Sequence, residues 1–159
     1  MTAKTRVVTP DRWSDHGEAV TRHPDGRLIS LWAGIPGEAA HASLAQAGQN
    51  KVEARFEAPA AGPHEGRRTP PCGRFNGCGG CPMMHLEPDW QRRARLATAK
   101  AAFRSQGLEE LIPSSVVPSP DGETEYRHVV KLSAGRSDYG NPRLGAYMRG
   151  SHKVLPIPS

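Results

Sequence analysis

The sequence predicts an α+β protein, mainly β, with a small β-barrel, then a cysteine-rich loop with one helix, then the start of an antiparallel β domain. Three observations predict this fold class. The 159 residues include 17 glycines and 15 prolines, a loop-rich composition. Apolar residues make up only 36% and aromatic ones 6%, so no large core can form. Polar and apolar side chains alternate in several short segments, as they do in half-buried strands.

The N-terminal part, residues 1–58, carries the signals of several short strands. The segments GEAVTRH and RLISLWA flank Pro24-Asp25-Gly26, which predicts a β-hairpin. Residues 51–57 alternate in the manner of a strand, and Ile35-Pro36-Gly37-Glu38 is a turn-forming stretch. Because closure removes exposed sheet edges, so many short strands in so little chain favour a small closed barrel.

The middle of the chain begins with a linker, residues 59–71, that is rich in proline and glycine. Residues 72–111 then combine the cysteine loop with a helix that runs from Pro88 to about Gln106. Pro88 and Asp89 suit the first turn of a helix, and Gly107 suits its end.

After a second linker at residues 112–125, residues 126–159 are expected to start a β domain. Residues 126–132 and 143–149 read as two strands joined by a turn. Alternation gathers cations and one aromatic ring on the two strands: Arg127, Lys131, Arg143, Tyr147 and Arg149. Such a face is typical of an RNA-binding sheet, and it is equally typical of an ordinary solvated one.

The net charge of +5 is unevenly distributed. Residues 66–104 carry 8 basic and 2 acidic side chains, and residues 126–159 carry 6 basic and 1 acidic. Residues 105–125 carry 5 acidic side chains and no basic one. A partner with a phosphate backbone would be attracted first to the cysteine segment and the C-terminal segment, unless the pattern is only the scatter of surface charge.

All three cysteines lie in one glycine-rich loop, at Cys72, Cys78 and Cys81. Three thiolates within reach of one centre, among glycines with free amides, favour an iron–sulfur cluster. A second interpretation is a zinc site in which His85 is the fourth ligand, and a third is a redox-active pair of Cys78 and Cys81. The residues alone leave these three alternatives open.

The loop from Cys72 to His85 resembles the iron–sulfur loop of the S-adenosylmethionine-dependent RNA uracil-5-methyltransferases. Residues 14–58 resemble a TRAM domain, the small OB-like RNA-binding barrel that precedes the loop in many of these enzymes. The matching motifs, in family order, are Gly17-Glu18-Ala19, Pro36-Gly37-Glu38, Cys78-Gly79-Gly80-Cys81, Tyr126-Arg127, Leu144-Gly145-Ala146-Tyr147 and Gly150-Ser151-His152. A TRAM domain with a cluster loop is closest to the branch that methylates 23S ribosomal RNA.

The resemblance implies a [4Fe–4S] cluster on Cys72, Cys78 and Cys81. Two features depart from the family. Met84 precedes His85 where the family usually has glutamine, and the family's fourth cysteine follows the GSH motif by more residues than this sequence contains. We therefore expect a cluster site that is one ligand short within these residues.

The resemblance also implies that catalysis occurs elsewhere. The family uses a cysteine that attacks C6 of uracil and a base that removes the C5 proton, both in a Rossmann-like domain that binds S-adenosylmethionine. No such fingerprint is present in these 159 residues. We expect no catalytic or S-adenosylmethionine-binding residue here, and a fragment that recognises structured RNA, such as 23S rRNA, beside a downstream catalytic domain or chain. The alternative is a stand-alone RNA-binding Cys3His zinc protein.

Two further features concern location. No run of residues approaches the roughly 18 apolar residues of a membrane span, and the first residues lack the apolar core of a secretory signal. Clustered cysteines in a protein without an export signal are expected to stay reduced in the cytoplasm. We therefore expect a cytoplasmic protein without a membrane partner.

Overall fold

The structure is a computed structural model that describes residues 5–120, 122, 124 and 128–156. It divides into two compact units. Unit 1 comprises Met1–Arg67 and Leu86–Val117, and unit 2 comprises Arg68–His85 and Pro118–Ser159. The chain thus passes from unit 1 to unit 2 and back before it enters unit 2 again. The predicted domain boundaries, which put the cysteine loop and the helix in one segment, stay a prediction.

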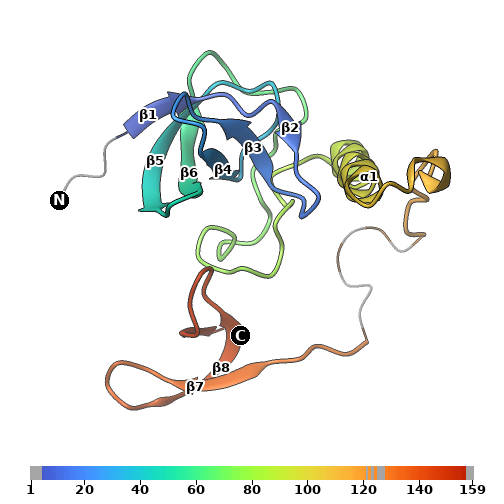
Figure 1. Ribbon diagram of the computed structural model, residues 1–159. Coiled ribbons are helices and arrows are strands. Elements are labelled where there is room, and N and C mark those ends of the chain that lie inside the picture. Colours follow the sequence, from blue (N-terminus) through green and yellow to red (C-terminus); the bar gives the residue numbers. More distant parts are fainter. Residues whose placement is uncertain (1–4, 121, 123, 125–127, 157–159) are drawn as a thin grey trace. The chain divides into compact units, whose positions relative to one another are not determined.

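Unit 1 contains a six-stranded sheet (Figure 1). Its strands are β1 (Thr5–Val8), β2 (Arg12–Trp13), β3 (Ala19–Arg22), β4 (Leu28–Trp32), β5 (Ala40–Ala47) and β6 (Lys51–Pro59). Their order is β1-β5-β6-β4-β3-β2, in which β4 and β6 are parallel and every other pair is antiparallel. With one long helix in the same unit, this architecture confirms the predicted mainly β, α+β class.

The sheet of unit 1 is rolled. Strands β1 and β2 stand at opposite ends of the strand order, yet only Thr9, Pro10 and Asp11 separate them in the chain. An extended chain from Val8 to Arg12 spans at most about 14 Å. In a flat sheet, five strand spacings would separate these strands by about 24 Å. The two ends of the sheet must therefore approach each other, which is the barrel-like form that the sequence predicts.

The core of unit 1 lies inside this rolled sheet. Ala40 and Ala42 of β5 are fully buried, and Ala54 of β6 is buried beside them. Small side chains suit the interior of a narrow barrel, where strands from facing sides come close. The rest of the buried cluster is Val8, Ile29, Leu31 and Val52. The hairpin between β3 and β4 is confirmed, and its turn uses Gly26 at φ 90°, a left-handed conformation that favours glycine.

Helix α1 (Pro88–Ser105) is confirmed close to its predicted ends, and a short 3-10 helix, η1 (Glu109–Leu111), follows it. Pro88 lies in the first turn, and Gly107, at φ 69°, follows the last. Trp90 packs against the ring of His64 at 4.5 Å between centroids. Among the described residues, no helix has both the length and the apolar character to cross a membrane.

A short stem in unit 1 joins the two ends of the cysteine loop. Arg67 and Leu86 form an isolated antiparallel bridge, and the amide of Glu87 donates to the carbonyl of Gly66 at 2.9 Å. Gly66 is close to Trp90, because a Cβ on this glycine would lie 2.3 Å from the indole Cγ. Residues 66–67 and 86–87 therefore hold the chain together where it leaves unit 1 and where it returns.

A buried ion pair anchors this stem. The Glu38 side chain is 1% exposed and that of Arg67 is 11% exposed. The guanidinium binds both carboxylate oxygens, with Nε 2.7 Å from Oε1, and it also donates to the carbonyl of Ala33 at 2.7 Å. Its central carbon lies 3.8 Å from the centroid of the Phe56 ring. The residue just before the cysteine loop is thus fixed to the barrel by charge, hydrogen bonds and stacking.

Unit 2 contains a three-stranded antiparallel sheet in the order β7-β8-β9. Its strands are β7 (Ser133–Arg136), β8 (Pro142–Tyr147) and β9 (Val154–Pro156). The predicted strand at 143–149 is confirmed in β8. The predicted strand at 126–132 is wrong where the structure describes it, because residues 128–132 form no strand and β7 begins at Ser133.

The register of the hairpin explains this difference. Arg136 pairs with Pro142 and Ser133 with Gly145, so Lys131 would face Tyr147, where β8 ends. Residues before Lys131 have no strand of this hairpin to pair with. Alternation indicated a strand, but the turn and the length of β8 decide where pairing stops.

A methyl group at Gly145 should separate β8 from β9. A Cβ there would lie 1.9 Å from the carbonyl oxygen of Leu155, a backbone atom that cannot move without breaking the pairing. We expect Gly145→Ala to lower the hydrogen-exchange protection of the Ala146 and Leu155 amides, which face each other across the two strands, by about 10–100-fold. The matched control is Gly73→Ala, since a Cβ at Gly73 meets no atom within 4 Å. Unchanged protection in Gly145→Ala would contradict the register.

Candidate functional site

The cysteine loop is fixed within unit 2 by main-chain contacts to the end of β8. Cys78 forms an isolated antiparallel bridge with Met148. The amide of Gly79 donates to the carbonyl of Tyr147 at 3.3 Å, and the amide of Arg149 donates to the carbonyl of Gly77 at 3.0 Å. The middle of the loop therefore continues the β8 backbone pairing.

The three predicted metal ligands lie in this one loop. Cys72 and Cys78 are half-buried, Cys81 is exposed, and none of them forms a disulfide with the others. The amide of Gly80 donates to the sulfur of Cys78 at 3.4 Å. Within residues 5–120, 122, 124 and 128–156, the structure assembles no group of three or more His, Cys, Asp or Glu side chains that could hold a metal ion.

His85, the predicted alternative zinc ligand, belongs to the packing of the loop. It is 2% exposed, and its ring is tilted against that of Phe75 at 5.6 Å between centroids. Phe75 is itself buried. The carbonyl of His85 accepts a hydrogen bond from the Arg68 amide at 2.9 Å, which joins the two ends of the segment 68–85 that contains the cysteine loop.

A groove of about 610 Å³ lies between the loop and the connection from β8 to β9. It is lined by Gly79, Gly80 and residues 146–152. The structure thus brings two predicted RNA contacts, Tyr147 and Arg149, to the glycines of the cysteine loop. The ring of His152, a residue that was not predicted to contact RNA, meets that of Tyr147 edge-on at 5.6 Å between centroids.

The other predicted RNA contacts lie outside this groove or outside the described residues. Lys131 and Arg143 are exposed and do not line the groove. Arg127 lies outside the described residues. The assignment of these side chains to RNA stays a prediction.

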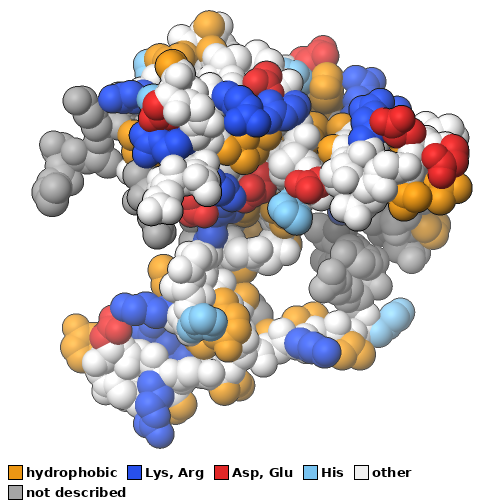
Figure 2. Space-filling view, viewed as in Figure 1, with side chains coloured by type: hydrophobic (Ala, Val, Ile, Leu, Met, Phe, Trp, Pro, Cys, Tyr) orange, Lys and Arg blue, Asp and Glu red, His pale blue; other side chains and the backbone are white. Residues whose placement is uncertain are grey.

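The described part of unit 2 is basic, and the unit also contains three carboxylates, Asp121, Glu123 and Glu125, outside the described residues. Its described residues include one carboxylate, Asp138, whose oxygen lies 3.6 Å from the Lys153 ammonium in an exposed pair. The cations among them are Arg68, Arg74, Lys131, Arg136, Arg143, Arg149 and Lys153. Figure 2 shows basic and hydrophobic side chains side by side on the visible face of this unit. A surface of this kind attracts a phosphate backbone.

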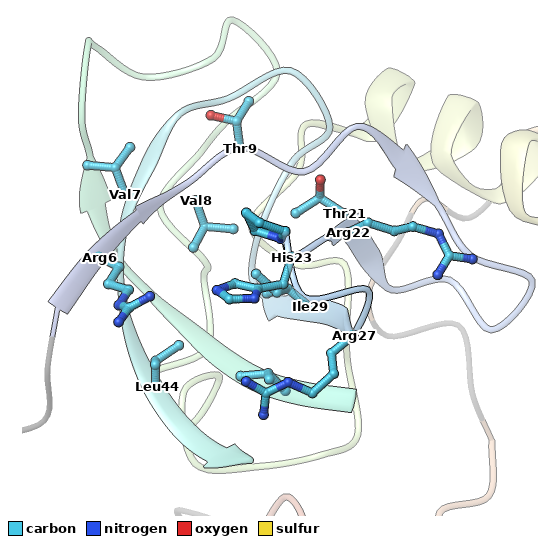
Figure 3. Close-up of a pocket in the computed structure, with 12 residues that line it drawn as sticks. Arg6, Val7, Val8, Thr9, Thr21, Arg22, His23, Arg27, Ile29 and Leu44 are labelled. Atoms are coloured by element: carbon cyan, nitrogen blue, oxygen red, sulfur yellow. The ribbon is translucent and has the colours of Figure 1, made fainter. Parts of the chain in front are cut away.

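A second cavity, of about 510 Å³, lies in unit 1 and was not anticipated from the sequence (Figure 3). Arg6 of β1 and His23 and Arg27 of the β3–β4 hairpin lie at its rim. Asp25, at the turn of the hairpin, accepts hydrogen bonds from the side chain and the amide of Arg27, which hold the pKa of its carboxyl well below the usual range. The sequence contained no signal for this cavity beyond the hairpin itself.

Comparison with known proteins identifies relatives over nearly the whole chain. The 23S rRNA (uracil(1939)-C(5))-methyltransferase RlmD of Chromohalobacter salexigens is 31% identical over 150 residues, which cover 94% of this chain and 30% of that protein. The enzyme of the same name from Halomonas elongata is 28% identical over 141 residues, 89% of this chain and 29% of that protein. An uncharacterized RNA methyltransferase of Bdellovibrio bacteriovorus is 31% identical over 144 residues, 87% of this chain and 34% of that protein.

No protein-family model matches the chain. The chain spans about 30% of the length of the Chromohalobacter salexigens and Halomonas elongata enzymes. The match nevertheless extends across both units, from the rolled sheet through the cysteine loop to the three-stranded sheet, since it covers 94% of the chain. Over nearly its whole length the chain therefore matches part of the proteins of the RNA uracil-C5 methyltransferase family, and it spans about a third of the length of these relatives.

Proposed function

We propose that this chain is the RNA-recognition and iron–sulfur portion of an S-adenosylmethionine-dependent 23S rRNA uracil-C5 methyltransferase. The observation that carries the proposal is its similarity to the Chromohalobacter salexigens enzyme, at 31% identity over 94% of the chain. Both compact units fall within that match, so the proposal concerns the whole chain.

The charge of unit 2 supports a role in RNA recognition. Lys and Arg side chains outnumber carboxylates among its described residues, and Tyr147 and Arg149 line one groove with the cysteine loop. Cations position a nucleic acid through its phosphates, and an aromatic ring can stack on an unpaired base. A stretch of 23S rRNA with unpaired bases would satisfy both kinds of contact.

The chemistry of the loop supports an iron–sulfur cluster. Cys72, Cys78 and Cys81 provide soft sulfur donors from one loop, and the Gly80 amide already donates to the sulfur of Cys78 at 3.4 Å. Hydrogen bonds of this type stabilise cluster sulfurs and tune their potential. The chemistry of these donors thus fits a cluster that the three cysteines would hold together with a fourth ligand, although the described residues do not gather them into one metal-holding group.

The packing of His85 favours the cluster over zinc. A Cys3His zinc site would need this imidazole as its fourth ligand. The ring is instead buried against Phe75, where it contributes to the packing of the loop, and a cluster would need no ligand from it.

We propose that methyl transfer itself is carried out by a separate region. Methylation at C5 of uracil requires a nucleophile that adds to C6 and a base that removes the C5 proton. The chain has no cysteine outside the loop that would hold the cluster. The chain therefore binds and positions the RNA for a catalytic region of the kind that the longer relatives contain.

A chimera tests this function. In a bacterial strain that lacks the 23S rRNA uracil-C5 methyltransferase, the matched segment of the Chromohalobacter salexigens enzyme is replaced by this chain. We expect mass spectrometry of 23S rRNA to detect 5-methyluridine with the chimera and none with the chain alone. The control is the same enzyme with the segment deleted. A folded chimera that methylates no more than this control would contradict the proposal.

A further inference from the structure

We infer that the cavity of unit 1 binds one unstacked nucleotide, with the base on its apolar floor and the phosphate at its cationic rim. The inference deepens the proposed RNA recognition and rests on it. It means that the rolled sheet binds RNA through one defined pocket and not only through the charge of its surface.

The floor of the cavity is apolar and its size suits such a ligand. Val8, Ile29 and Val52, which are buried, line it together with the partly buried Leu44. The volume of about 510 Å³ falls within the roughly 300–1,000 Å³ of small-molecule sites. A free inorganic anion would leave this floor unused, whereas the flat face of a base would cover it.

The rim of the cavity is cationic. Figure 3 shows Arg6 on one side, His23 and Arg27 on the hairpin facing it, and Arg22 directed away from the cavity. Among the described residues that line the cavity, none is an aspartate or a glutamate. A phosphate would therefore meet cations at this rim without repulsion from the lining.

The rim residues differ in what they can offer. The Arg27 guanidinium is bound to Asp25, with Nη2 2.6 Å from Oδ2, so part of its charge is already neutralised. His23 is also held by Asp25, with Nδ1 2.8 Å from Oδ1, which orients the ring. The side chain of Arg6 forms no hydrogen bond or ion pair within the part of the chain that the structure describes. Arg6 is thus the cation available to a phosphate, and His23 supplies a flat ring on which a base can stack.

Nuclear magnetic resonance of the full chain tests the site with three probes: uridine 5′-monophosphate, hexauridylate, and an abasic ribose-phosphate oligomer of equal length. We expect the first two to shift the amides of residues 6–9 and 21–29. The abasic oligomer should bind about tenfold more weakly than hexauridylate, because it cannot occupy the apolar floor. Arg6→Ala should weaken hexauridylate binding about tenfold.

The matched control is Arg104→Ala, which removes the same charge from helix α1 of the same unit at a residue that does not line the cavity. Equal weakening by the two variants, or equal affinity for the abasic oligomer, would overturn the site and leave only a charged surface. If uridine 5′-monophosphate binds and hexauridylate does not, the cavity is a nucleotide site, and the inference that its ligand is part of an RNA is overturned. An inactive methylation chimera with intact cavity binding would refute the proposed function alone, and an active chimera whose cavity binds no probe would refute this inference alone.

Discussion

Replacing Arg67 by alanine should lower the free energy of unfolding of unit 1 by about 3–5 kcal/mol. The substitution would leave the Glu38 carboxylate buried at 1% exposure without its guanidinium partner. It would also remove the hydrogen bond to Ala33 and the contact with the Phe56 ring. The cost of a buried carboxylate left without a counter-charge dominates this effect, since among the described residues only the amide of His64, 3.0 Å from Oε1, remains as a donor to it.

Urea unfolding followed by tryptophan fluorescence measures this change selectively, because all three tryptophans, Trp13, Trp32 and Trp90, belong to unit 1. The control is Lys51→Ala, which breaks the Lys51–Glu18 pair, whose side chains are 38% and 29% exposed. A solvent-accessible, half-buried pair of this kind contributes on the order of 1 kcal/mol or less. If both variants lowered the urea midpoint by the same small amount, the Glu38–Arg67 pair would not anchor the stem as its burial indicates.

Replacing Cys81 by serine should remove most of the iron from protein purified without oxygen. Serine is a poor ligand for iron in a cluster, and loss of one of three thiolates from the loop should lower metal retention at least about tenfold. Iron, acid-labile sulfide and the broad visible absorbance should all fall together. This effect depends on the proposed cluster.

The comparison with His85→Ala distinguishes the cluster from zinc. If the loop holds a cluster, this variant should retain iron while it loses the stability contributed by packing on Phe75. If the loop holds zinc with His85 as a ligand, both variants should lose zinc, and neither should contain sulfide. Gly73→Ala controls for changes in the loop itself, since its Cβ would meet no atom within 4 Å.

Local signals predicted the elements whose ends depend on backbone chemistry. The β3–β4 hairpin follows from Pro24-Asp25-Gly26, where Gly26 adopts a positive φ. Helix α1 follows from Pro88 at its start and Gly107 past its end. In both cases the turn or the helix end is fixed by a residue in that turn or beside that end. The sequence alone is therefore sufficient to locate it.

The sequence was less informative where pairing with a distant strand decides the structure. Strand β5 (Ala40–Ala47) was not predicted individually, because alanine has little preference for strands and only its alternation with His41 and Ser43 indicates one. Two features of the sites were likewise invisible. Glu38 and Arg67 are far apart in the chain, and the cavity beside Arg6 exists only after the sheet has rolled.

The stem that joins Arg67 to Leu86 has a thermodynamic consequence for the loop of residues 68–85. In an open chain, the ends of this segment would have to be brought together at the cost of loop-closure entropy, which rises by about 0.6 kcal/mol for each doubling of length. Folding of unit 1 brings these two ends together, so the loop-closure entropy is already lost before a metal binds. By linkage, a metal that binds the closed loop more tightly than the open one must stabilise the stem by the same free energy. The melting temperature of unit 1 should therefore rise with occupancy of the proposed cluster, although the three cysteines that would hold it all lie in unit 2.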